Sequence, residues 1–269
     1  MGWDPKTYLA FGAERTRPAA DLLARVTLEQ PRRVADLGCG PGNSTALLRA
    51  RWPKAEIDAI DFAPEMLADA RKGGVDARFI EADIAEWTPD EPYDVIYSNA
   101  ALQWLEDHET LLPRLVSFVR PGGVLAVQVP RNFEERCHVL LKRAVSDSRW
   151  SSELKDVRDW WNVLEPEAYF DLLHPGALRA PSLQSAAKPT GAKSIDLWET
   201  RYFHVLAGKD PVFHWMMGTG LRPFAAALKS PLKEEFLEHY RGLLAAVYPP
   251  RPGGQTIHRF LRLFFVVSL

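Results

Sequence analysis

The chain has 269 residues, with 33 Lys and Arg against 35 Asp and Glu, so its formal net charge is −2. Hydrophobic residues make up 46% and charged residues 25%, which is typical of one globular domain or of one domain with an inserted cap. A near-neutral balance supplies no long-range positive field, so nucleic-acid binding is not expected. The sequence lacks both a long apolar run and a signal-peptide core, so we expect no membrane contact and a cytoplasmic location.

The first 130 residues predict a helical segment followed by an alternation of strands and helices. Residues 1–30 read as an N-terminal helical lid, with Leu22, Leu23 and Val26 on one apolar stripe. Residues 31–130 read as a ligand-binding core. Strands are predicted over 33–40, 56–61, 77–83, 93–100 and 123–130, with helices over 44–52, 64–74 and 108–120. Apolar strands that alternate with helices indicate a parallel sheet covered on both faces, hence an α/β fold.

After residue 130 the alternation stops. Residues 131–194 and 207–255 are mostly helical and aromatic, with a stretch rich in Pro, Gly and Ser at 174–194, and read as a helical cap with loop insertions. Residues 195–206 and 257–268 predict two strands. We expect these two strands to lie antiparallel at one edge of the sheet, which gives seven strands in a single domain.

The strongest local pattern is the run Asp36-Leu37-Gly38-Cys39-Gly40-Pro41-Gly42-Asn43, which joins the first strand to a helix. Glycines at Gly38, Gly40 and Gly42 allow a tight turn and let a ligand approach the backbone closely. The helix that begins near Asn43 offers free N–H groups at its start. In an open α/β sheet, ligands bind at this end of the strands.

Two acids follow the loop at the ends of the next two strands. Asp61 stands where a carboxylate can accept both hydroxyls of a ribose. Asp83 stands where it can accept from an adenine amino group, with Ile84 beside the ring. A dinucleotide site would need the spacing G-x-G-x-x-G, whereas this loop has G-x-G-x-G. Asp36 would crowd a pyrophosphate but suits a ligand with a cationic amino-acid end.

The run D-L-G-C-G-P-G resembles the first motif of class I S-adenosylmethionine-dependent methyltransferases, and Asp61 and Asp83 match that family's second and third acidic positions. The resemblance implies a Rossmann-like fold and S-adenosyl-L-methionine as cofactor. The predicted cofactor-binding residues are Asp36, Gly38, Gly40, Gly42, Asn43, Asp61, Asp83, Ile84 and Asn99. The alternative of another class is a nucleotide-binding protein that methylates nothing, such as a nicotinamide-dependent oxidoreductase.

Segments outside the glycine loop narrow the resemblance to a smaller family. The opening W-D-P-x-x-Y-x-x-F-x-x-E-R-x-R-P-A, N-A-A-L-Q-W-L at 99–105, G-V-L-A-V-Q-V-P-R-N-F at 123–133 and T-G-L-R-P-F at 219–224 together resemble the trans-aconitate 2-methyltransferase family. The resemblance covers nearly the whole chain. It implies esterification of one carboxylate of trans-aconitate, or of a closely related small polycarboxylic acid. As a separate expectation, the protein is a monomer or a weak homodimer.

A carboxylate is already the nucleophile at neutral pH, so no catalytic base is expected and catalysis should come from positioning, in which Gln103 and Trp104 could take part. Arginine matches carboxylates bidentately. Arg262 is a weaker candidate, because an arginine near a sheet edge usually lies on the solvated surface. The predicted acceptor-binding residues are Tyr8, Phe11, Arg15, Arg17, Gln103, Trp104, His138 and Arg222.

The chain also departs from the family pattern. Residues 177–190 look like an insertion, and Arg131, Arg201, His258 and Arg259 are unexpected at their positions. These departures leave the exact acid open, and a phenol or quinone is the alternative acceptor. No metal is expected, because the Cys and His residues lack ligand spacing, and the sequence has no G-x-S-x-G elbow of a hydrolase.

Overall fold

The computed structural model describes residues 12–157, 162–174 and 191–269. Within them the chain forms one seven-stranded sheet in the order β3-β2-β1-β4-β5-β7-β6. The pairs from β3 to β5 are parallel and the two pairs made by β7 are antiparallel. The strands are β1 Arg33–Leu37, β2 Glu56–Asp61, β3 Arg78–Glu81, β4 Tyr93–Asn99, β5 Val119–Pro130, β6 Ser194–Leu206 and β7 Thr256–Ser268. The predicted mainly parallel α/β sheet is confirmed.

Helices connect these strands, and several of them gather on the β6–β7 ribbon. The helices are α2 Gly12–Ala24, α3 Asn43–Arg51, α4 Pro64–Lys72, α5 His108–Ser117, α6 Arg136–Val145, α7 Ser151–Leu154, α8 Pro166–Leu173, α9 Pro211–Met217, α10 Arg222–Ala227 and α11 Leu232–Val247, with a 3-10 helix η1 at Leu102–Trp104. The predicted helix over 108–120 ends earlier, at Ser117. The Phe118 carbonyl instead accepts from the Tyr93 N–H at 2.8 Å, because the chain there already runs into β5.

The sheet buries both of its faces. Alternate residues of β5 belong to different cores, with Ala126 on one face and Val127 on the other. On the Ala126 face α2 crosses the sheet, and Tyr97 Oη donates to the Ala19 carbonyl at 2.6 Å. On the other face Leu112 of α5 joins the core beneath the sheet. This two-sided burial explains why the central strands are apolar along most of their length.

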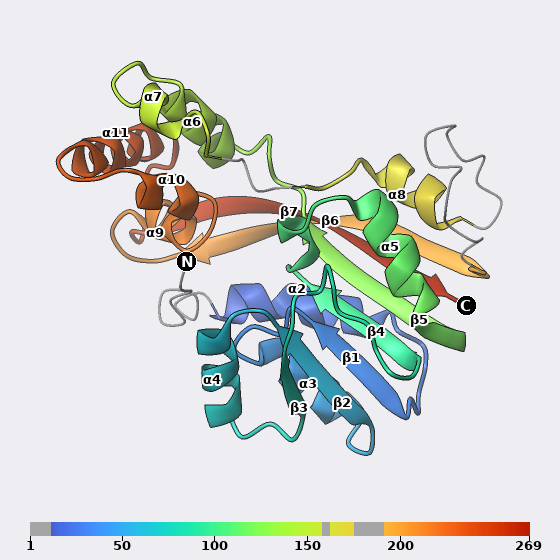
Figure 1. The fold of residues 1–269 in the computed structure, drawn as a ribbon. Coiled ribbons are helices and arrows are strands. Elements are labelled where there is room, and N and C mark those ends of the chain that lie inside the picture. The colour runs from blue at the N-terminus through green and yellow to red at the C-terminus, as the bar shows by residue number, and fades with distance from the viewer. Residues whose placement is uncertain (1–11, 158–161, 175–190) are drawn as a thin grey trace.

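Strands β6 and β7 form a long antiparallel ribbon that carries the cap. Figure 1 shows α6, α7, α9, α10 and α11 gathered at one end of this ribbon, while α5 and α8 lie nearer its other end. The two strands expected at one edge are antiparallel neighbours there. β6 is the edge strand itself, and β7 lies inside the sheet, between β5 and β6. Phe264 and Phe265, consecutive on β7, are both fully buried, which confirms that this strand is covered on both faces.

Candidate active site

The loop between β1 and α3 has the positive-φ backbone that its glycines predict. Gly38, Gly40 and Gly42 have φ angles of 73°, 54° and 92°, a region that residues with a side chain rarely adopt. A β-carbon added to Gly38 would overlap the Ala101 side chain, whereas one added to Gly40 would meet nothing within 4 Å. The loop is therefore packed closely at Gly38 and open at Gly40, as a ligand cradle requires.

Asp36 lies at the base of this loop and is fully buried. Its Oδ2 accepts from Ser44 Oγ at 2.8 Å and from Thr45 Oγ1 at 2.7 Å, both at the start of α3. Its Oδ1 has no hydrogen-bond partner among the described residues. Burial raises the pKa of Asp36 to about 6, although both hydroxyl donors oppose this rise. A cationic group beside Oδ1 would remove much of the cost of burying this carboxylate.

Two amide oxygens near the end of β4 are, like Asp36 Oδ1, buried acceptors without a donor among the described residues. Asn99 Oδ1 and Gln103 Oε1 are buried and find no hydrogen-bond partner in the described part of the chain. Gln103 Nε2 donates to the Ala100 carbonyl at 2.7 Å, which fixes the orientation of its amide. With Asp36 Oδ1 they make three unsatisfied acceptors near the adjacent ends of β1 and β4. An ammonium group carries three donors, so the set fits the amino-acid end predicted for the ligand.

Asp61 ends β2 and is 8% exposed. Its Oδ2 accepts from the Gly40 N–H at 2.8 Å and its Oδ1 from the Ala63 N–H at 2.9 Å. Burial raises the pKa of Asp61, and these two backbone donors oppose the rise. Each carboxylate oxygen keeps a further lone pair, so the side chain can brace the glycine loop and still accept from a ribose hydroxyl.

Asp83 lies two residues beyond the end of β3, not at it. It is exposed, and its Oδ1 accepts from the Ala85 N–H at 2.8 Å. Ile84 is 8% exposed, and its Cδ1 would lie 3.8 Å from a β-carbon on Gly38, which places its side chain beside the loop. Asn43 Nδ2 donates to Thr16 Oγ1 at 3.2 Å and so ties the loop to α2. All nine predicted cofactor residues therefore lie on the glycine loop or near the ends of β1, β2, β3 and β4.

The structure describes some, but not all, of the residues predicted to bind the methyl acceptor. Tyr8 and Phe11 fall outside the described residues, as does the side chain of Arg15. Arg17 is exposed, with its guanidinium carbon 5.2 Å from the centre of the Tyr202 ring. This contact puts Arg17 of α2 beside β6.

Arg222 and His138 come from the cap. Arg222 begins α10 and is half-buried; burial lowers its pKa, and the charge of Glu65, in the first turn of α4, opposes this. Glu65 also acts on Asp61, so Arg222 lies on the side of the molecule that holds the glycine loop. His138 is 6% exposed, and burial lowers its pKa to about 4, so its ring is neutral at pH 7. Trp104 is half-buried on η1.

One expectation is wrong. Arg262 does not lie on the solvated surface but is only 3% exposed, because β7 is an interior strand. Its Nη1 donates to Gln128 Oε1 at 3.2 Å, and its guanidinium lies 4.4 Å from the centre of the Phe260 ring. Gln128 and Asn132, also buried, were not predicted as site residues. The only sequence signal for them is a polar residue at an inward position of an apolar strand and another just after it.

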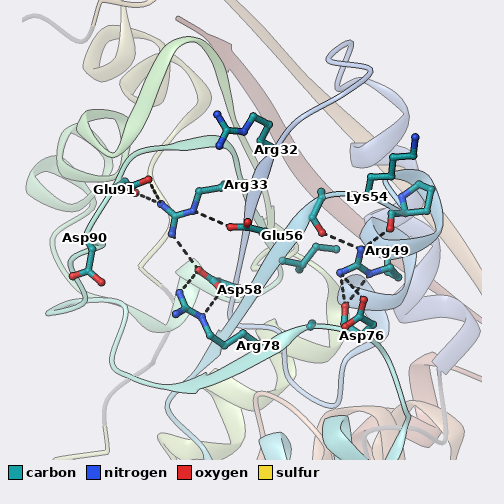
Figure 2. A pocket seen from close by; sticks show the side chains of 14 residues that line it. Arg32, Arg33, Arg49, Lys54, Glu56, Asp58, Asp76, Arg78, Asp90 and Glu91 are labelled. Atoms are coloured by element: carbon teal, nitrogen blue, oxygen red, sulfur yellow. Dashed lines mark hydrogen bonds and ion pairs between the residues drawn. The ribbon is translucent and has the colours of Figure 1, made fainter.

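A pocket of about 770 Å³ lies at the opposite, amino ends of β1, β2 and β3. Figure 2 shows most of its charged side chains paired with one another, while those of Arg32, Lys54 and Asp90 have no such pair in the view. Asp58 accepts from Arg78 through two bonds of 2.7 Å and lies 3.6 Å from Arg33, while Arg49 lies 3.4 Å from Asp76. These pairs satisfy most of the pocket's charges internally, and the pocket lies at the end of the strands away from the glycine loop, so we assign it no part in the site.

Two negative findings concern the described part of the chain only. It holds no group of three or more His, Cys, Asp or Glu side chains arranged to bind a metal ion. Its helices include none with the length and apolar character needed to cross a membrane.

Comparison with known proteins first defines the class. Residues 34–123 match the sequence family described as "Methyltransferase domain", which spans β1 to the start of β5. The fold matches the YcgJ protein of Bacillus subtilis, with a TM-score of 0.57, 12% identity, and coverage of 94% of this chain and 98% of that one. It also matches phosphoethanolamine N-methyltransferase 2 of Haemonchus contortus, with a TM-score of 0.52, 15% identity, and coverage of 94% and 52%. The fold and the loop are those of class I methyltransferases.

Relatives that match over nearly the full length show which methyltransferase family the chain belongs to. The chain is 47% identical over 264 residues to trans-aconitate 2-methyltransferase of Klebsiella pneumoniae, covering 98% of this chain and 96% of the relative. It is 44% identical over 267 residues to the protein of the same name in Methylobacterium radiotolerans, covering 98% and 97%. The Rhodopseudomonas palustris protein is 42% identical over 267 residues, covering 98% of each chain. The chain belongs to the trans-aconitate 2-methyltransferase family.

Proposed function

We propose that this protein transfers a methyl group from S-adenosyl-L-methionine to a carboxylate of trans-aconitate or of a closely related small polycarboxylic acid. The observation that carries the cofactor assignment is the group of unsatisfied acceptors Asp36 Oδ1, Asn99 Oδ1 and Gln103 Oε1 beside an open glycine loop. Support for the acceptor comes from the names of the full-length relatives.

Each proposed cofactor residue contacts a different part of S-adenosylmethionine. Asp36, Asn99 and Gln103 accept from the ammonium, and Gly40, where an added β-carbon would meet nothing within 4 Å, leaves room for the chain that joins it to the nucleoside. Gly42 packs against Ala70 and sets the turn into α3. Asp61 accepts from the ribose hydroxyls, and Asp83 and Ile84 hold the adenine. When bound, S-adenosylmethionine supplies a sulfonium methyl group, which a carboxylate oxygen takes while the carbon–sulfur bonding pair passes to sulfur, giving the methyl ester and S-adenosylhomocysteine.

The protein's part in this reaction is to bind and orient the acid. Arg222 of α10 and Arg17 of α2 bring positive charge from two sides, and Arg15 is assigned the same role. A carboxylate with an ordinary pKa near 4 needs no base at pH 7, so no residue is assigned as a general base. Holding the oxygen in line with the methyl carbon is the main source of rate enhancement.

The remaining proposed residues enclose the site. Tyr8, Phe11 and Trp104 wall the acceptor, and His138, neutral at pH 7, offers it a hydrogen bond from the cap. Residues 1–30 act as a lid that α2 joins to the glycine loop through Thr16 and Asn43. Residues 131–194 and 207–255 form the cap and its loop insertions, on a core of residues 31–130.

The test is a methyl-transfer assay with labelled S-adenosylmethionine against trans-aconitate, cis-aconitate, citrate, isocitrate and several phenols. We expect selective transfer to trans-aconitate. Transfer to a phenol but to none of the acids would overturn the acceptor assignment and leave the cofactor assignment in place. Failure to bind S-adenosylhomocysteine in a calorimetric titration would overturn both.

A further inference from the structure

Gln128 presents a donor group that nothing in the described structure uses. It lies on β5, directly beside Asn99 of β4, and is fully buried. Because Arg262 Nη1 donates to its Oε1 at 3.2 Å, the amide is oriented with Nε2 on the other side. Nε2 carries two N–H groups and has no hydrogen-bond partner among the described residues. A buried donor left unsatisfied is unfavourable in the free protein, and a ligand that accepts from it would remove that cost.

Asn132, two residues beyond the end of β5, is a second buried side-chain amide without a hydrogen-bond partner among the described residues. It is 1% exposed, and neither Nδ2 nor Oδ1 finds a hydrogen-bond partner in the described part of the chain. The backbone on either side is held: Pro130 pairs with Arg262, and the Arg131 N–H donates to the Leu261 carbonyl at 2.9 Å. Asn132 is therefore fixed near the end of β5 that also carries Gln128.

The surroundings of these amides favour an anion. Arg262 is buried beside Gln128, and its guanidinium lies over the Phe260 ring and 5.9 Å from the centre of the Tyr202 ring. The positive charge of Arg262 also disfavours protonation of the buried His258 on the same strand. Amide N–H donors in a positive potential are the environment that a carboxylate requires.

We propose that Gln128 and Asn132 bind a carboxylate of the acceptor that is not methylated, and that they thereby set the preference for a tricarboxylate over a dicarboxylate. This inference rests on the proposed function. The proposed cofactor lies at the adjacent ends of β1 and β4, so the reacting carboxylate belongs beside these strand ends. β5 lies one strand further, about 4.8 Å away, which is close to the spacing of two carboxylates in one small polycarboxylic acid.

Asn132→Leu is the first variant, because it removes no hydrogen bond of the Asn132 side chain within the described structure. A merely structural residue of this kind should tolerate the change or become more stable, since a buried unsatisfied amide is lost. We expect an unchanged or higher Tm together with a KM for trans-aconitate raised about tenfold or more, the range for loss of a hydrogen bond to a charged group. The Kd of S-adenosylhomocysteine should stay within about threefold, well below the tenfold step that marks a lost hydrogen bond.

Gln128→Glu is the second variant, because it keeps the shape and replaces the donor with a like charge. We expect the KM for trans-aconitate to rise about 100-fold, and the ratio of kcat/KM for trans-aconitate to that for glutaconate or mesaconate, which each lack one carboxylate, to fall at least tenfold. Gln255→Glu adds the same charge at an exposed position of the chain and serves as the matched control.

The outcomes separate the inference from the proposed function. If wild-type protein methylates trans-aconitate and both variants keep its KM and its preference over the dicarboxylates, the inference is wrong and the proposed function stands. If wild-type protein binds S-adenosylhomocysteine but methylates none of the polycarboxylic acids, the proposed function fails and the inference fails with it. A fall in kcat/KM by the same factor for tricarboxylate and dicarboxylates would mark a structural role and also overturn the inference.

Discussion

Ala101 occupies the space in which a side chain at Gly38 would begin. A β-carbon on Gly38 would overlap that of Ala101. The Gly38 φ of 73° is a second reason why a residue with a side chain is disfavoured there. This contact joins the loop after β1 to the loop after β4, so the two segments that present Asp36 and Asn99 are held against each other. The geometry of the cofactor site thus depends on one glycine and one alanine.

Gly38→Ala should therefore damage the site, and Ala101→Gly should repair part of the damage. We expect Gly38→Ala to lower the free energy of unfolding by about 2 kcal/mol or more, from overlap and backbone strain together. The double variant relieves the overlap but not the strain and should recover about half of the loss. Urea unfolding of the three variants measures this. Equal stability of the single and double variants would show that the two side chains do not compete for space.

Cofactor affinity should depend on pH through Asp36. Its pKa is raised to about 6 in the free protein by burial, and an ammonium ligand requires the carboxylate form. Protonation competes with binding below pH 6, so the Kd of S-adenosylhomocysteine at pH 5 should be about tenfold higher than at pH 7. Asp36→Asn should bind more weakly at pH 7 and show little change between pH 7 and pH 5. A wild-type Kd that does not change over this interval would contradict the assignment of Asp36 to the ammonium.

Arg222→Ala should weaken acceptor binding while leaving cofactor binding almost unchanged. Loss of a charge-assisted bond to a carboxylate is worth about 1.5–3 kcal/mol, which corresponds to a KM raised about 10- to 150-fold. Steady-state kinetics with varied trans-aconitate and a calorimetric titration with S-adenosylhomocysteine give the two quantities. Arg143→Ala, at an exposed position on α6, is the matched control. An unaltered acceptor KM in Arg222→Ala would remove this arginine from the acceptor site.

His258 should make the fold sensitive to acid. Its pKa is lowered to about 3, mainly by burial and in smaller part by repulsion from His204, His138 and Arg262. The unfolded chain binds this proton near pH 6.5 and the folded chain does not, so stability is full above pH 6.5 and falls as the pH drops. Between pH 7 and pH 5 this residue alone should cost roughly 2 kcal/mol of stability.

His258→Phe tests the acid sensitivity directly. We expect its Tm to fall less than that of wild-type protein between pH 7 and pH 5, because one of the buried imidazoles no longer takes up a proton on unfolding. His214→Phe, at an exposed position on α9, should behave as wild-type protein does. If His258→Phe and wild-type protein lose the same stability on acidification, another group is responsible for it.

Much of the site could be predicted from local sequence. The glycine loop and Asp61 depend on a few consecutive residues whose spacing fixes a turn, and the three glycines indeed adopt positive φ. The end of β3 was less well predicted. Asp83 was expected to end that strand, but the strand stops at Glu81, because pairing with β2 ends at Asp61. Strand ends depend on the neighbouring strand, which local sequence does not reveal.

The sequence by itself determined the fold class, the loop and the acids beside it, because alternating apolar runs and a glycine turn are local properties of the chain. Only the tertiary structure decided the position of Arg262. Strand pairing placed β7 inside the sheet, between β5 and β6, and so buried a guanidinium expected in solvent. The same pairing set that guanidinium against Gln128, 134 positions away in the chain. Contacts of such separation arise from sheet order and register, and these are settled by how all the strands pack together.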